Sequence, residues 1–202
     1  MEDTAHLLHS DGPGNWIRDT PSLINRSQTC EEQVGLWAAS VPDWLSIHSM
    51  PESSMSNEFA HFLRSRLLQW RQMLTLPLLY VVAHTSDAGP QARAKARECI
   101  DFSAQRILSN PYLGRHGGTW FVLRHTFMSA MAICAYKLSS EEDYSDDWER
   151  AIDIAIEILR AWSGQADDVN TMYEFLDMVV GRVRSRSTPS TPVVDSTGSL
   201  RT

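Results

Sequence analysis

The segment from Thr119 to Leu138 constrains the fold of this 202-residue chain more than any other stretch. It reads Thr-Trp-Phe-Val-Leu-Arg-His-Thr-Phe-Met-Ser-Ala-Met-Ala-Ile-Cys-Ala-Tyr-Lys-Leu, so a helix there would be apolar on every side. Such a helix is buried among other helices or spans a membrane. Its length suffices for a span, although Arg124, His125 and Lys137 interrupt it. Apolar faces in the neighbouring segments favour a core helix of a globular domain.

Helical periodicity also appears in four segments that begin near Asn57, Pro90, Ser145 and Asp168. In the first segment Gln72 is predicted on the outer side, and Pro77 is expected to kink the helix or restart it. The apolar stripe of the third segment, which includes Trp148, Ile152 and Leu159, and Phe175 of the fourth are predicted to point inward. Asn57 and Ser145 are residue types that cap helices, and Gly89-Pro90 suits a helix start. No alternation typical of strands has comparable strength. The sequence therefore predicts the all-α class, with a single helical domain of about five to seven packed helices.

Composition divides the chain into three regions. Residues 1–20 have little periodicity and are expected to be disordered or loosely packed. Residues 21–184 contain the periodic segments and are expected to form the helical domain. Residues 185–202 are rich in Ser, Thr and Pro, which predicts a disordered tail.

The charge balance argues against a general nucleic-acid surface. The net charge is -7 and the pI is about 5.4, whereas nucleic-acid binding needs a basic footprint. Arg182, Arg184 and Arg186 form one basic stretch at the end of the last periodic segment. Cations there complement a helix dipole. We therefore expect no DNA-binding residues and no direct DNA contact by this chain.

Cysteine usage bears on the cellular compartment. Cys30, Cys99 and Cys134 are odd in number and widely spaced, which does not fit a disulfide framework. Cys99 and Cys134 lie in apolar helical segments and are interpreted as small core residues. The first residues lack the basic and apolar stretches of a secretory signal. These observations predict a reducing compartment and a protein that is not secreted.

Motifs for metal binding are weak. The chain has no Cys-x-x-Cys and no His-Glu-x-x-His, and His125 is interpreted as a hydrogen-bonded core histidine. Residues 143–147 are rich in oxygen ligands, but Trp148 and Ile154 occupy the positions where a calcium loop needs Gly and Glu. No nucleophile and base occur in a known arrangement. We assign no metal, cofactor or catalytic residue from these patterns.

One acidic segment leaves an enzymatic alternative open. Asp167-Asp168-Val169-Asn170-Thr171-Met172-Tyr173-Glu174 comes near the metal-binding pattern of all-helical isoprenoid enzymes, which hold a diphosphate through magnesium ions. The glutamate is one residue early for a shared helical face, and no second aspartate-rich motif faces it. A small metal-dependent enzyme of this type is the alternative to a protein without catalytic activity.

Several motifs occur in a suggestive order along the chain. They are Leu68-Gln69-Trp70-Arg71-Gln72-Met73-Leu74 with Pro77 and Tyr80, then Ala96-Arg97-Glu98-Cys99-Ile100, His116-Gly117-Gly118-Thr119-Trp120-Phe121, and the segment from Trp148 to Ser163. In order and spacing they resemble the fungal-specific transcription factor domain, the helical region that follows a zinc binuclear cluster in many fungal regulators. The resemblance covers roughly residues 35–183 and matches the C-terminal part of that domain.

The resemblance implies a regulatory domain without catalytic activity. Such a domain would act in the nucleus through protein contacts, and a small-molecule effector is a further option; without the resemblance the cytoplasm is expected. Trp70, Arg71 and Trp120 match the family pattern and are expected to be structural, with Trp120 buried at the start of the most apolar helix. The six cysteines of a zinc cluster are absent from the sequence. A truncated gene product without independent activity is therefore a third hypothesis.

A partial domain would leave apolar faces uncovered, which predicts self-association or dependence on a partner. The candidate faces are the turn from Leu76 to Val82 and the stripe of small residues Ala92, Ala96, Cys99 and Ser103. The alternative is that residues 1–55 fold back and cover these faces through Trp16, Leu36, Trp37 and Trp44.

Overall fold

The computed structural model of the chain describes residues 12–42, 58–109, 118–140 and 147–187. Within these ranges the structure contains seven α-helices and no strand, so the predicted all-α class is confirmed. The helices are α2 (Pro13–Arg18), α3 (Thr20–Ala39), α4 (Glu58–His84), α5 (Gly89–Leu108), α6 (Thr119–Ser139), α7 (Asp147–Ser163) and α8 (Asp167–Ser187).

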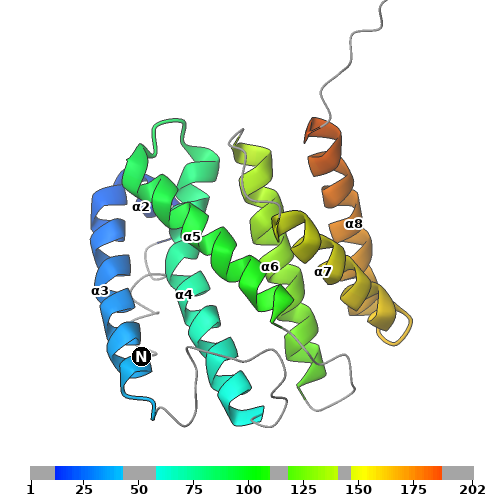
Figure 1. Cartoon of the computed structure of the whole chain (residues 1–202). Coiled ribbons are helices and arrows are strands. Elements are labelled where there is room, and N and C mark those ends of the chain that lie inside the picture. The colour runs from blue at the N-terminus through cyan, green and yellow to red at the C-terminus, as the bar shows by residue number, and fades with distance from the viewer. Residues whose placement is uncertain (1–11, 43–57, 110–117, 141–146, 188–202) are drawn as a thin grey trace, which may run out of the picture.

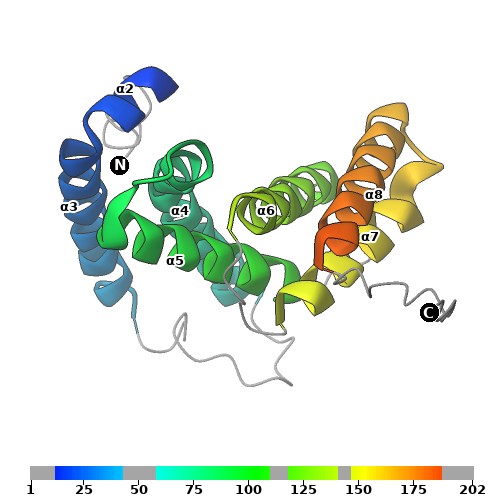
Figure 2. The ribbon, with the colours of Figure 1, turned by 90° about the horizontal axis from the view of Figure 1, so that it is seen from above.

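The helices pack in two layers. Helices α4, α6 and α8 lie side by side in one layer, and α5 and α7 cross over them in the other (Figures 1 and 2). Helix α3 covers the outer side of α4. The chain direction brings the start of α4, the end of α5 and the start of α6 to the same end of the molecule (Figure 1). This arrangement positions the polar cluster described below.

The buried side chains form two hydrophobic clusters. The larger cluster lies mainly among α5, α6, α7 and α8, and its members include Ile133, Tyr136 and Leu159. The second cluster lies between α3 and α4 and includes Leu23, which is fully buried. Val82 of α4 packs against both clusters. Helices α4 and α5 therefore connect two packed regions of one domain.

The apolar segment that dominates the sequence forms α6. Eight of its residues are buried, which agrees with a core helix. However, Phe121 is 57% exposed and Met128 is 47% exposed, so the prediction that every side is buried was wrong. Within the described ranges, no helix has the length and apolar character needed to cross a membrane.

Two helix-breaking residues act differently at their positions. Pro77 lies inside α4, which stays unbroken from Glu58 to His84 instead of restarting there. Gly89 begins α5 with φ of 74°, a backbone conformation that L side chains disfavour. The predicted Gly89-Pro90 helix start is confirmed, because α5 begins at Gly89 with Pro90 in its first turn.

The ends of the domain differ in part from expectation. Residues 13–18 form α2, although residues 1–20 were expected to lack order or close packing. Trp16 packs edge-on against Tyr80 of α4, with ring centroids 5.7 Å apart. Helix α8 continues to Ser187, into the region predicted as a tail. The predicted cap Ser145 and the rest of both predicted end regions lie outside the described residues.

The faces expected to be uncovered are covered within the chain. Ala92, Ala96, Cys99 and Ser103 are all fully buried, and Leu78 and Val81 of the predicted apolar turn are fully buried as well. The expectation of uncovered faces at these positions was therefore wrong.

Helices α2 and α3 supply part of this cover. Trp16 and Trp37 pack against the second cluster, while Leu36 is 73% exposed and Trp44 lies outside the described residues. The buried Ser27 hydroxyl of α3 also donates to the Leu74 carbonyl at 3.0 Å. The fold-back alternative is therefore right for the two tryptophans and wrong for Leu36.

Candidate functional site

The three residues that match the family pattern lie in three different environments. Trp70 is half-buried and packs against the α3–α4 cluster, as a structural role predicts. The guanidinium of Arg71 lies 5.6 Å from the ring centroid of Phe102 on α5. Trp120 is 42% exposed, so its predicted burial was wrong. The three side chains contact different helices and do not form a common site.

Trp120 and the acidic segment meet at the start of α8. The indole Nε1 of Trp120 donates to Asp168 Oδ2 at 3.0 Å, while Asp168 Oδ1 accepts from the Val169 backbone N–H. Farther along, Asn170 Nδ2 donates to Glu174 Oε1 at 2.9 Å. In the described part of the chain, no group of three or more His, Cys, Asp or Glu side chains is placed to hold a metal ion. The acidic segment thus stabilises the first turns of α8.

The three cysteine thiols are buried. Burial raises the pKa of Cys99 and of Cys134 to about 12, and it also raises the pKa of Cys30. A buried thiol with a raised pKa is a poor nucleophile, because the thiolate is the reactive form. The prediction that Cys99 and Cys134 are small core residues is confirmed.

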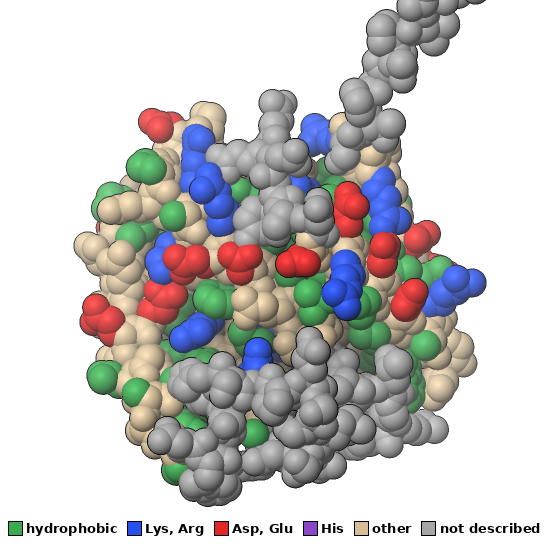
Figure 3. Space-filling model, in the orientation of Figure 1, with side chains coloured by type: hydrophobic (Ala, Val, Ile, Leu, Met, Phe, Trp, Pro, Cys, Tyr) green, Lys and Arg blue, Asp and Glu red, His purple; other side chains and the backbone are tan. Residues whose placement is uncertain are grey.

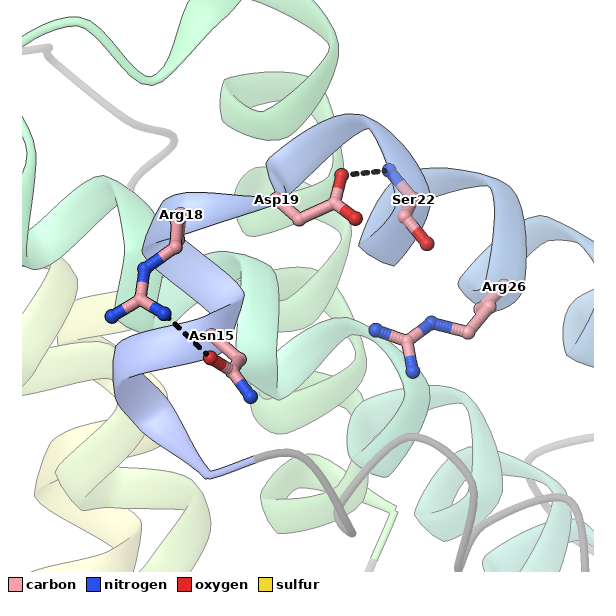
Figure 4. Close-up of a pocket in the computed structure, with 5 residues that line it drawn as sticks. All are labelled: Asn15, Arg18, Asp19, Ser22 and Arg26. Atoms are coloured by element: carbon pink, nitrogen blue, oxygen red, sulfur yellow. Dashed lines mark hydrogen bonds between the residues drawn. The ribbon is translucent and has the colours of Figure 1, made fainter.

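A surface hollow of about 340 Å³ lies where α2 meets α3 (Figure 4). It is lined by Asn15, Arg18, Asp19, Ser22 and Arg26. Asp19 Oδ1 accepts from the Ser22 backbone N–H at 3.2 Å and so caps α3. Arg18 donates to Asn15 Oδ1 at 3.5 Å. These contacts show that polar side chains lining the hollow stabilise the ends of α2 and α3.

A buried polar cluster lies where α4, α5 and α6 meet. Gln72 of α4 was predicted on the outer side of its helix, but it is only 6% exposed. Its Nε2 lies 2.8 Å from Ser103 Oγ of α5 and 3.2 Å from Ser129 Oγ of α6, donating to both. Its Oε1 accepts a hydrogen bond from the guanidinium of Arg106. One side chain therefore joins three helices through polar contacts.

Cationic groups surround this cluster. Burial, together with the nearby charge of Arg66, lowers the pKa of the half-buried Arg106 to about 10. Burial and the charges of Arg106, Arg66 and Arg124, in that order of effect, lower the pKa of His125 to about 4. His125 is half-buried, and the core hydrogen bond predicted for it is not among the contacts of the described residues.

The described residues give these cations no carboxylate partner. Arg106 donates to Gln72, and Arg66 donates to Gln69 Oε1 at 2.8 Å while its guanidinium lies over the ring of Phe62. Neither arginine is in an ion pair with a described Asp or Glu. The polar contacts of Arg66 and Arg106 in the described residues are thus with the side-chain amides of Gln69 and Gln72.

The outer face of α6 and α8 carries exposed apolar side chains. Phe121, Arg124 and Met128 recur at helical spacing on α6, and Phe175 (46% exposed) and Met178 (50% exposed) do so on α8. The two helices meet here, because the rings of Phe127 and Phe175 are in contact at 6.4 Å between centroids. Phe175 was predicted to point inward, which was wrong.

The face formed by α5 and α7 has a different character. Acidic and basic side chains are both scattered over it in the view of Figure 3. Mixed charges of this kind are typical of a solvated surface. Exposed apolar area is instead concentrated on α6 and α8, where we define Phe121, Met128, Phe175 and Met178 as the apolar face.

Comparison with known proteins adds no assignment to this geometry. No protein family, curated protein or solved structure matches the chain.

Proposed function

We propose that the chain is a regulatory helical domain of the fungal transcription-factor type, which acts in the nucleus by binding another protein. The resemblance in motif order supports the domain type. The observation that carries the protein-binding role is the apolar face, whose four members are each at least 46% exposed. Exposed aromatic and Met side chains gathered on two adjacent helices are typical of protein interfaces.

The apolar face suits one kind of partner, an amphipathic helix with acidic residues beside its apolar side. Paired helices offer a shallow groove in which such a helix places residues spaced by three and four positions. Met is well suited to this role because its flexible side chain adapts to the surface it meets. Exposed Arg124 lies between Phe121 and Met128, and its positive charge complements an acidic flank.

A tethering experiment tests this proposal. The chain is fused to an unrelated DNA-binding domain in a fungal cell, and transcription from a reporter carrying that domain's sites is measured. We expect the fused chain to change reporter output several-fold relative to the DNA-binding domain alone. Met128→Glu and Phe175→Glu should abolish the change, because a charge in the apolar face is desolvated when the partner binds.

Leu36→Glu is the matched control, since Leu36 is an equally apolar exposed residue on α3, away from the face. It should leave reporter output at the level of the parent chain. The proposal is wrong if the fused chain has no effect, or if all three variants behave alike at equal protein levels. Sedimentation of the purified chain tests whether the apolar face binds a second copy of the same chain. A dimer that is lost in Phe175→Glu would show this and would overturn the proposal that the partner is a different protein.

A further inference from the structure

We propose that Arg124 and Arg182 determine which helix binds the apolar face, by selecting a partner helix that carries two acidic residues about ten positions apart. This inference rests on the proposed function, because it names the recognition pattern of the same face. Its basis is the register between α6 and α8, which places the two arginines before and after Met128, Phe175 and Met178 along the helix axis.

Helices α6 and α8 run in the same direction and keep one register along their length (Figure 1). Three contacts join them at the start, the middle and the end, namely Trp120 with Asp168, Phe127 with Phe175, and the Leu138 carbonyl with Arg186. The two members of each pair are 48 residues apart in the sequence. A constant offset at three levels means that the two helices are parallel, and it fixes which of their residues are level with each other.

Both helices present a stripe of the same spacing on this side of the domain. Exposed residues recur at steps of three and four, in the order Phe121, Arg124 and Met128 on α6 and Phe175, Met178 and Arg182 on α8. Such steps keep side chains on one face of a helix. Each stripe thus combines apolar side chains with one arginine.

The two arginines lie on different helices and at different levels. Arg124 of α6 is level with Met172 of α8, and Arg182 lies ten residues farther along α8. With a rise of about 1.5 Å per residue, this separation is about 15 Å along the helix axis. A helix that lies along the face therefore meets the two positive charges about ten residues apart, on opposite flanks of its apolar side.

Arg182 differs from the two other arginines near the end of α8. Arg184 forms an ion pair with Asp153 of α7, and Arg186 donates to the Leu138 carbonyl of α6. Arg182 is exposed and makes neither kind of contact with the described part of the chain. Its charge is therefore available to a partner at this end of the face.

Arg124 is held in position at the other end. Its guanidinium lies 5.2 Å from the ring centroid of Trp120, whose indole N–H is itself bonded to Asp168. Contact with an aromatic ring does not neutralise the guanidinium, so Arg124 still attracts a carboxylate.

A pair of separated charges supplies the selectivity that apolar contacts lack. Apolar side chains accept many helices, whereas a charge at the rim favours an opposite charge and repels a like one. A helix with Glu or Asp at both positions satisfies Arg124 and Arg182 together. A helix with Lys at either position is disfavoured even when its apolar side is the same.

A peptide-display selection on the full chain measures this pattern directly. The library holds amphipathic helices of about five turns, with Leu at steps of three and four and with Glu, Gln or Lys varied at the flanking positions. Peptides that still bind the Phe175→Glu chain are removed, because they bind elsewhere. We expect the remaining peptides to carry Glu on opposite flanks, about ten residues apart.

Charge reversal then tests each arginine with the most enriched peptide, by fluorescence anisotropy at constant ionic strength. Arg182→Glu should weaken binding about tenfold, and Lys in place of the matching Glu of the peptide should restore most of the affinity. Arg124→Glu should act in the same way at the other acidic position. Restored binding also shows that the variant chain is folded.

Arg160→Glu is the matched control, since it reverses an exposed positive charge on α7 in the other layer. It should leave the affinity within about twofold. Three results would each overturn the inference: flanking charges that are not enriched, equal weakening in Arg160→Glu, and the absence of any peptide whose binding is lost in Phe175→Glu.

The tethering experiment keeps the two proposals separate. A reporter change that is lost in Phe175→Glu but unaffected by Arg124→Glu and Arg182→Glu would leave the apolar face as an interface and would overturn only the recognition pattern. Loss of the reporter change in both arginine variants, with Arg160→Glu unaffected, is the expected result.

Discussion

The side chain of Gln72 joins α4, α5 and α6 through polar contacts. Its amide donates to a hydroxyl on each of the two neighbouring helices and accepts from Arg106. Ser103 also donates to the Cys99 carbonyl at 2.7 Å, so the polar contacts continue along α5. Buried polar groups connected in this way specify a single arrangement of helices.

We predict that Gln72→Leu lowers the free energy of unfolding by about 2–4 kcal/mol, because it leaves Ser129 and the half-buried Arg106 without their partner. Urea denaturation followed by tryptophan fluorescence measures the change. Gln105→Leu makes the same substitution at an exposed position on α5 and should stay within about 0.5 kcal/mol of the parent chain. Equal stability of the two variants would show that the Gln72 contacts contribute nothing.

The sequence places Gln72 incorrectly for a physical reason. Hydrophobic periodicity assigns a polar residue to the solvent side, and a polar residue is buried only when partners on other helices satisfy it. Those partners, Ser103 and Ser129, are 31 and 57 residues away in the chain. Ser103 was predicted to lie in a stripe of small residues that is left uncovered, whereas it is fully buried. The sequence alone does not show that the stripe faces Gln72.

Helix α6 shows what periodicity predicts well and what it misses. The segment, its helical state and its burial among other helices follow from the apolar composition, while the structure shows that α5 and α7 are among these helices. A run that is apolar on all sides contains no information about which side is left open. Which side of α6 is left exposed depends on where α8 packs against it. The contact of Trp120 with Asp168 is one example of that packing. Amphipathic α7 is the converse case, and its predicted inward residues are buried or half-buried as expected.

The exposure of Trp120 changes the expected effect of removing it. We predict that Trp120→Ala lowers the free energy of unfolding by about 1 kcal/mol, because it removes one hydrogen bond and a partly buried side chain. Trp148→Ala should cost about 3–5 kcal/mol, because Trp148 on α7 is only 6% exposed. Thermal and urea denaturation of both variants measure the difference. A Trp120→Ala variant as unstable as Trp148→Ala would contradict the exposed position at the start of α6.

At the scale of the whole molecule, the surroundings of His125 make stability depend on pH. Burial, followed by the charges of Arg106 on α5, Arg66 on α4 and Arg124 on α6, lowers the pKa of the imidazole from 6.5 to about 4. The unfolded chain therefore binds more protons than the folded chain between these values. The stabilising effect is complete above about pH 6.5 and is lost as the pH falls toward 4.

We predict that protonation of His125 lowers the free energy of unfolding by about 1–2 kcal/mol as the pH falls from 6.5 toward 4. The effect is limited because water screens part of the repulsion at a half-buried group. Urea denaturation at pH 7.0, 5.5 and 4.5, run in the absence of polyvalent anions, measures it. His125→Gln cannot be protonated and should show a smaller loss over this range. His84→Gln is the control and should keep the full dependence of the parent chain. An identical pH profile for all three proteins would refute the prediction.

The two hydrophobic clusters have a consequence for how the domain opens. The cluster between α3 and α4 is joined to the larger one through the α4–α5 pair, and Lys95 of α5 contacts Glu31 of α3. Separation of α2 and α3 therefore breaks the smaller cluster while Ile133, Tyr136 and Leu159 stay packed. We therefore expect two cooperative units that share the α4–α5 hairpin, with partial unfolding beginning at the N-terminal side of the domain.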